Sequence, residues 1–165
     1  MLTCGFILTT TNTLYCTGRN EERELGVGST EGSCKVPVKV EWNTPIVDIL
    51  CGGSCCVAMT SDGRILFSGS LNYLCGDDGT CQPVMKDILE VFQEKAGNFY
   101  NWSEFSINEV KESMIEFEKL YRDPSYEKCF SAGSSHHYIA FKRSEARAIP
   151  RLYAVFSSGK FNDIH

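Results

Sequence analysis

The chain has 165 residues, of which 42% are hydrophobic, enough for one ordinary core and too few for two large domains. The formal net charge of −5 leaves no surplus of Lys and Arg for phosphates, so direct binding of nucleic acid is not expected. No stretch approaches the roughly 20 apolar residues of a membrane span, and residues 1–8 lack the basic leader of a signal peptide.

The first predicted element is a β-hairpin over residues 3–18, made of two apolar strands that flank a short turn. The same arrangement returns over residues 54–69 without a gap, at an offset of 51 residues that places Gly18 over Gly69. At the turn, Asn12 matches Gly63, which follows Asp62. Asn and Gly most readily adopt a positive φ, so both copies satisfy the same backbone requirement.

Two further strands are predicted between the hairpins. Residues 36–42 alternate apolar and polar side chains, and residues 46–50 lead into the turn at Gly52 and Gly53. Two strands and a hairpin make about four strands per unit, the content of one propeller blade. The alternative is an ordinary antiparallel sandwich in which the two hairpins are alike by coincidence.

Residues 85–126 interrupt this pattern with a predicted helical insertion, centred on residues 86–122. Residues 87–92 form a short candidate helix, and a stronger one begins at Ser106. In the stronger helix, apolar residues recur at steps of three and four, and Asp123 with Pro124 marks its end. We expect this apolar stripe to cover strands or an open sheet edge; a partner-binding helix is the alternative. The stripe contains Ile107, Val110, Met114, Phe117, Leu120 and Tyr121.

A third, weaker copy of the hairpin follows the insertion. Gly133 lies over Gly52, His136 lies over Cys55, and the closing strand ends at Gly159. A polar loop over residues 142–150 lengthens this copy. We therefore predict an all-β single domain, a partial β-propeller of two to three four-stranded antiparallel blades. Its parts are a first blade unit (1–50), a second unit (51–84), the helical insertion (85–126) and a third, incomplete unit (127–165).

The segment after the first hairpin resembles the repeat of the regulator of chromosome condensation family. In that repeat a strand ending in Trp-Gly precedes x-Asn-x-x-Gly-Gln-Leu-Gly-x-Gly, a proline and a Gly-Gly-x-His turn. This chain departs from the pattern at Thr17, Arg23 and Glu24, which replace Trp, Gly and Gln. The residues that match the pattern or its turns, all given a structural role, are Gly18, Asn20, Leu25, Gly26, Gly28, Gly52, Gly53, Asp62, Gly63, Gly69, Asn72, Gly76, Gly133, His136, Gly159 and Asn162.

The nine cysteines form no Cys-x-x-Cys pair, so we expect free thiols that fill apolar strands in an intracellular protein of the cytoplasm or nucleus. No catalytic residue, metal site or cofactor is expected, and the glycine-rich loop lacks the Gly-Lys-Ser/Thr ending of a phosphate site. The enzyme alternative is a Cys/His centre, which pairs Cys55 or Cys56 with His136 or His137. We expect His136 to be a packed structural residue.

The resemblance implies propellers of about seven blades, whereas this sequence supplies two to three. An open arc leaves sheet edges and an apolar face to be covered. We therefore expect a non-catalytic protein-binding or scaffold module, a subunit of a larger complex. The resemblance also implies an alternative, guanine-nucleotide exchange on a Ran-like small GTPase. A fragment of a longer product would leave similar edges, although Met1 in phase with the repeat favours a natural N-terminus.

Overall fold

The computed structural model describes residues 4–52, 54–71, 80–95, 107–132, 137–143, 152–157 and 160–162. Two helices and three antiparallel sheets make up this part of the chain. The elements are β1 (Gly5–Leu8), β2 (Leu14–Arg19), β3 (Ser33–Lys39), β4 (Ile46–Gly52), β5 (Cys55–Thr60), β6 (Ile65–Ser70), β7 (Cys81–Asp87), α2 (Ile88–Lys95), α3 (Ile107–Arg122), β8 (Tyr126–Ala132), β9 (His137–Arg143), β10 (Leu152–Ser157) and β11 (Lys160–Asn162).

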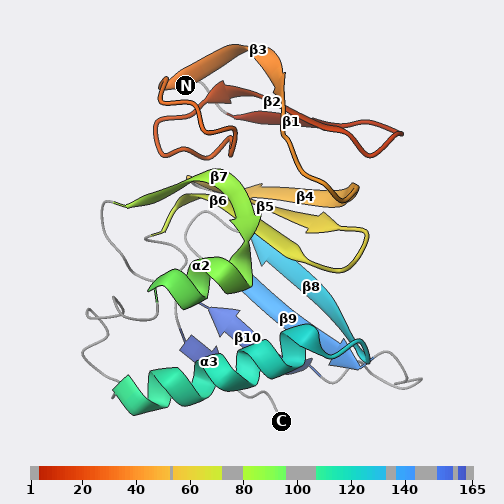
Figure 1. Cartoon of the computed structure of the whole chain (residues 1–165), viewed down its shortest axis with the longest axis vertical. Helices are drawn as coiled ribbons and strands as arrows, with labels where there is room; N and C mark the ends of the chain where they lie inside the picture. The colour runs from red at the N-terminus through yellow and green to blue at the C-terminus, as the bar shows by residue number, and fades with distance from the viewer. Residues whose placement is uncertain are drawn as a thin grey trace.

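The sheets follow one another along the long axis of the molecule, as consecutive blades do (Figure 1). Their strand orders are β1-β2-β3, β4-β5-β6-β7 and β11-β10-β9-β8. The partial propeller predicted from the sequence is confirmed, with three described strands in the first sheet and four in each of the others. The sheet boundary lies earlier than the predicted unit boundary, because β4 pairs with β5 and so opens the second sheet.

The two hairpin turns have the same backbone and the same hydrogen bonds. Asn12 has φ 58° and Gly63 has φ 80°, which confirms the predicted equivalence. In the first turn, the Thr9 side-chain oxygen accepts from the Thr13 amide at 3.0 Å; in the second, Thr60 accepts from Arg64 at 3.0 Å. A left-handed residue held between these bonds lets each chain reverse tightly.

Asn12 is exposed, so its backbone conformation alone explains its identity. We expect Asn12→Ala to lower the free energy of unfolding by about 1 kcal/mol, because alanine is strained at positive φ. Asn12→Gly should stay within about 0.5 kcal/mol of the parent, since relief of strain offsets the added freedom of the unfolded chain. Urea unfolding midpoints measure both, with exposed Thr10→Ala as control. An alanine variant as stable as the parent would contradict the explanation.

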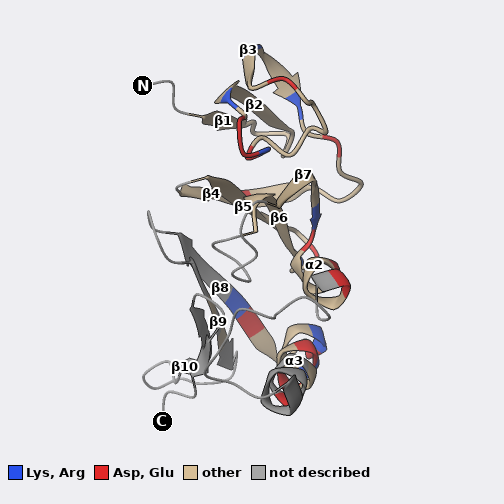
Figure 2. Cartoon of the chain, turned by 90° about the vertical axis from the view of Figure 1, so that its left-hand side faces the viewer, with Lys and Arg blue, Asp and Glu red and all other residues tan. Residues whose placement is uncertain are grey.

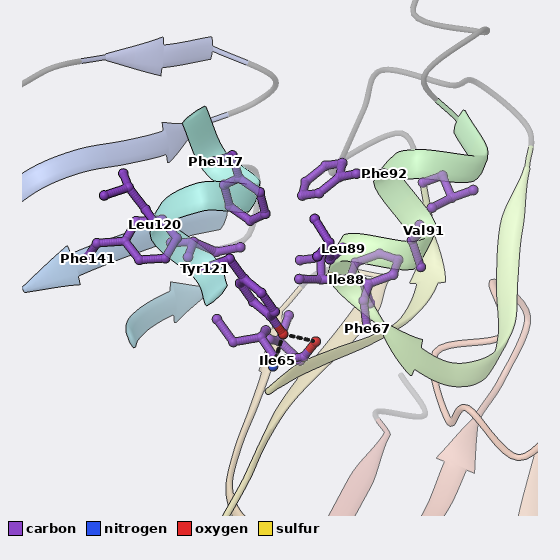
Figure 3. Packing of buried hydrophobic residues seen from close by; sticks show 14 residues of the cluster. Ile65, Phe67, Ile88, Leu89, Val91, Phe92, Phe117, Leu120, Tyr121 and Phe141 are labelled. Carbon is purple, nitrogen blue, oxygen red and sulfur yellow. Dashed lines mark hydrogen bonds between the residues drawn. The ribbon is translucent and has the colours of Figure 1, made fainter. Parts of the chain in front are cut away.

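Two apolar cores hold the sheets together. The first lies between sheets one and two and includes Leu14, Leu25 and Leu66. The second joins sheet two to the helices and to sheet three, and it includes Phe67, Phe92, Phe117, Leu120 and Phe141 (Figure 3). The helical insertion therefore shares its core with two blades, as expected for a covering element.

The outer edges of the first two sheets carry a proline each. Pro37 lies in β3 and Pro83 in β7, and both are exposed. Proline has no N–H to offer a neighbouring strand, so Pro37 discourages pairing along the β3 edge. On the β7 edge, Pro83 contributes its carbonyl, which accepts from the Gly28 amide. Helix α2 follows β7 directly, and both helices lie on the β7 side of the second sheet, away from β4 (Figure 2). Among the described residues, no helix is long and apolar enough to cross a membrane.

Candidate functional site

The loop after β2 is organised around the buried side chain of Asn20. Its Nδ2 donates to the carbonyl oxygens of Ser29 at 3.2 Å and Glu31 at 3.0 Å. Its Oδ1 accepts from the amide of Leu25 at 3.2 Å. One asparagine thus satisfies three backbone groups on both sides of the loop, and Leu25 enters the first core.

The far part of this loop attaches the first sheet to the second. The Gly28 amide donates to the carbonyl of Pro83 at 2.8 Å, and the Met85 amide donates to the carbonyl of Gly26 at 3.0 Å. A Cβ on Gly26 would lie 2.8 Å from Ser68 Oγ, so glycine is required for this close approach. The repeat motif therefore lies where two blades join, so its residues have a structural role.

The two departures from the family pattern within this loop have contacts of their own. Arg23 has φ 63°, where the pattern has glycine, and its guanidinium donates to the Thr30 carbonyl at 2.8 Å. Glu24 is buried and accepts from the Glu22 amide at 2.9 Å, with Arg19 Nε at 3.7 Å. The loop keeps its shape because local hydrogen bonds compensate for an arginine in a left-handed conformation.

Removal of the Asn20 side chain should destabilise the chain. We expect Asn20→Ala to lower the free energy of unfolding by about 2 to 3 kcal/mol, because three loop groups lose their partners. Urea unfolding measures the change. Exposed Asn43→Ala is the matched control and should change the value by less than about 0.5 kcal/mol. Equal effects of both substitutions would show that the Asn20 bonds contribute nothing.

The cysteines lie mainly in the strands around the first core. Burial raises the pKa of Cys16 and of Cys55 to about 12, and burial also raises the pKa of Cys56. Thiols of this kind are poor nucleophiles because the reactive thiolate is scarce. No group of three metal-binding side chains occurs among the described residues.

Several predicted positions fall outside the described residues, namely Gly53, Asn72, Gly76, Gly133, His136 and Gly159. Asn162 lies in β11 and His137 lies in β9. The proposed pairs of Cys55 or Cys56 with a histidine therefore remain predictions.

One end of the first two sheets gathers both hairpin turns, on the right of Figure 1. We call it the turn face and define it by residues 9–13, 40–46, 60–64 and 121–124. Arg64 connects its parts: it donates to Thr44 Oγ1 at 2.9 Å, and its Cζ lies 5.7 Å from the centre of the Trp42 ring. Arg64 also pairs with Asp62 at 2.7 Å, and this hydrogen-bonded pairing lowers the pKa of Asp62.

A cavity of about 510 Å³ opens beside Arg64, and we call it the Lys128 cavity. Four segments line it: the β5–β6 turn, the start of α2, the end of α3 and β8. At its wall the Tyr121 hydroxyl accepts from the Ile65 amide at 2.7 Å (Figure 3). The same hydroxyl donates to Asp87 Oδ1 at 3.1 Å. Asp87 Oδ1 also accepts from the Leu89 amide at 3.0 Å, so one carboxylate holds both helices to the sheet.

Sequence reasoning missed the residues that form this cavity. Arg64 follows the predicted turn, Tyr121 was assigned only to an apolar stripe, and Lys128 lies in a strand that carries no motif. The only local signal was the polar turn itself, because the cavity depends on how the insertion packs.

Comparison with known proteins places these features in context. A model of the regulator of chromosome condensation (RCC1) repeat matches residues 12–59. The human and mouse regulators of chromosome condensation are each 38% identical to this chain over 79 residues, 47% of the chain and 19% of the relative. The chain thus spans about a fifth of the length of these relatives.

Solved structures extend the comparison to 93% of the chain. Human WBSCR16 superimposes with a TM-score of 0.54 at 17% identity, and the chain covers 30% of it. Yeast RCC1 (Prp20) bound to Kap60 gives a TM-score of 0.55 at 15% identity, with 29% covered. At these identities the superpositions show the fold alone.

Proposed function

We propose that this chain, which carries a regulator of chromosome condensation repeat over residues 12–59, is a non-catalytic protein-binding module, a subunit of a larger assembly. The observation that carries the proposal is the turn face, where Trp42 and Arg64 lie beside the Lys128 cavity. Trp and Arg are among the residue types enriched at the energetic centres of protein interfaces. A second cavity, of about 210 Å³, lies beside Trp42 on the same face.

The test compares what the full chain captures from native cells with what two variants capture. Arg64→Ala removes the side chain that connects the turn face, and exposed Lys35→Ala on β3 is the matched control. We expect the parent and the control to retain the same partners, and Arg64→Ala to lose them while its unfolding midpoint stays close to the parent value. Identical capture by all three proteins would contradict a partner site on the turn face.

The second candidate is guanine-nucleotide exchange on a Ran-like small GTPase. The 38% identity to the human regulator over 79 residues favours it, and the structure of yeast Prp20p is described with its binding properties to Gsp1p and histones. The test measures nucleotide release from a purified Ran-type GTPase. Acceleration by the chain supports exchange, and an unchanged release rate removes this candidate.

We propose further that the chain acts in the cytoplasm or nucleus, because free thiols fit a reducing compartment.

The absence of catalysis is also part of the proposal. Treatment with a thiol-alkylating reagent should leave partner capture intact, since Cys16, Cys55 and Cys56 are buried and the exposed Cys51 lies outside the turn face. Substrate turnover that alkylation abolishes would contradict a purely binding role.

A further inference from the structure

Lys128 brings a positive charge into the cavity without a close acceptor. Among the described residues no hydrogen bond or ion pair involves its ammonium, whose Nζ lies 4.9 Å from the centre of the Tyr121 ring. The side chain is half-buried, and burial lowers the pKa of this ammonium. A partly desolvated cation gains from an anionic acceptor more than a fully hydrated one does.

Two of the three acids that line the cavity, Asp62 and Asp87, are already occupied by nearer donors, and the third, Glu90, is exposed at the start of α2. Asp62 accepts from Arg64 and from Thr60. Asp87 accepts from the Leu89 amide at 3.0 Å, with the Tyr121 hydroxyl at 3.1 Å. These carboxylates make the electrostatic potential at Lys128 less positive, but they accept no hydrogen bond from its ammonium. The three ammonium donors are therefore available to a carboxylate that enters from outside.

Two arginines on the rim of the cavity add to this preference. Arg64 pairs with Asp62, and Arg122 pairs with Glu118 at 2.8 Å, both on the surface. Exposed ion pairs contribute little to stability, so an incoming carboxylate can share these guanidinium groups at little cost. The three cations come from separate parts of the chain, the β5–β6 turn, α3 and β8, and meet at this cavity.

The size and opening of the cavity indicate a peptide segment as its occupant. A volume of about 510 Å³ exceeds what one carboxylate or phosphate fills, and Leu89 and Pro124 give it an apolar wall. We propose that the Lys128 cavity binds an acidic segment of a protein partner, with an Asp or Glu carboxylate on the Lys128 ammonium. This inference rests on the proposed binding function and specifies the chemistry of its partner.

The test uses the full chain and a fluorescent hexapeptide of alternating Glu and Leu, followed by fluorescence anisotropy. The comparison peptide has Gln in place of Glu. We expect Lys128→Met to weaken binding of the Glu peptide about tenfold or more, and Lys128→Arg to restore most of it. Lys119→Met is the matched control, because Lys119 lies on the exposed side of α3 outside the cavity and should leave the affinity unchanged.

Three results would overturn the inference: no binding of the Glu peptide, equal binding of the Gln peptide, or equal weakening by Lys119→Met. Inorganic phosphate that displaces the peptide at similar concentration would assign the cavity to small anions instead. The capture experiment is independent of these results. Partners that depend on Arg64, combined with no binding of the acidic peptide, would leave the binding function standing and remove only this inference.

Discussion

Gly69→Ala is expected to lower the free energy of unfolding by about 3 kcal/mol or more. Gly69 has φ 105°, and a Cβ there would lie 2.4 Å from the Ser54 carbonyl oxygen and 2.5 Å from Cys55 Cα. Both obstacles are backbone atoms at the β4–β5 turn, so the strand itself would have to move. Left-handed strain costs about 1 to 3 kcal/mol, and the steric overlap adds a similar amount.

The matched control is Gly28→Ala in the first loop. Gly28 has φ 72°, yet the nearest atom to its added Cβ is Val84 Cγ1 at 4.0 Å. This variant should therefore show the backbone strain without the overlap, a loss of about 1 kcal/mol. Urea unfolding of both variants separates the two contributions. If Gly69→Ala costs no more than Gly28→Ala, the close approach of Gly69 to the β4–β5 turn does not exist.

Phe117→Ala is expected to cost about 3 to 5 kcal/mol, because it empties the centre of the second core. The Phe117 ring is fully buried among three aromatic neighbours, with centroid separations of 5.3 Å to Phe92, 5.6 Å to Phe141 and 5.7 Å to Tyr121. These neighbours come from α2, β9 and α3, so the cavity left behind would loosen the insertion from the third sheet as well as from the second.

Ile115→Ala on the same helix is the control for Phe117→Ala. Ile115 is 68% exposed, and alanine has the higher helix propensity, so this variant should be neutral or slightly more stable. Thermal or urea unfolding compares the two. A Phe117→Ala variant as stable as Ile115→Ala would mean that α3 is an appendage and contributes no core.

The local parts of the fold could be predicted because their causes are local. The turn at Asn12 and Gly63 follows from the need for positive φ, and the hairpin strands follow from their apolar pattern. The helix that ends at Arg122 follows from the spacing of Phe117 and Leu120 and from Pro124 beyond it. In each case a few neighbouring residues determine the local structure.

The candidate site could not be predicted because its causes are distant in the chain. Tyr121 reaches the Ile65 amide across 56 positions, and the cavity that contains Lys128 is also lined by Arg64 and Leu89 from distant parts of the chain. The assignment of β4 depended on the same kind of information. Its apolar pattern predicts a strand, but only the pairing of Ile49 with Ala58 shows to which sheet it belongs.

The offset between the repeat and the sheets has a consequence for how such proteins gain or lose blades. A repeat of 51 residues that starts at Gly5 runs to Cys55, so it contains the whole of β4, which is the first strand of the following sheet. Duplication of one unit would add a blade together with the strand that joins it to the next sheet. Deletion of one unit would remove the blade and that strand together. Growth by whole units therefore leaves every remaining joint intact, which lets arcs of different length arise from one ancestral segment.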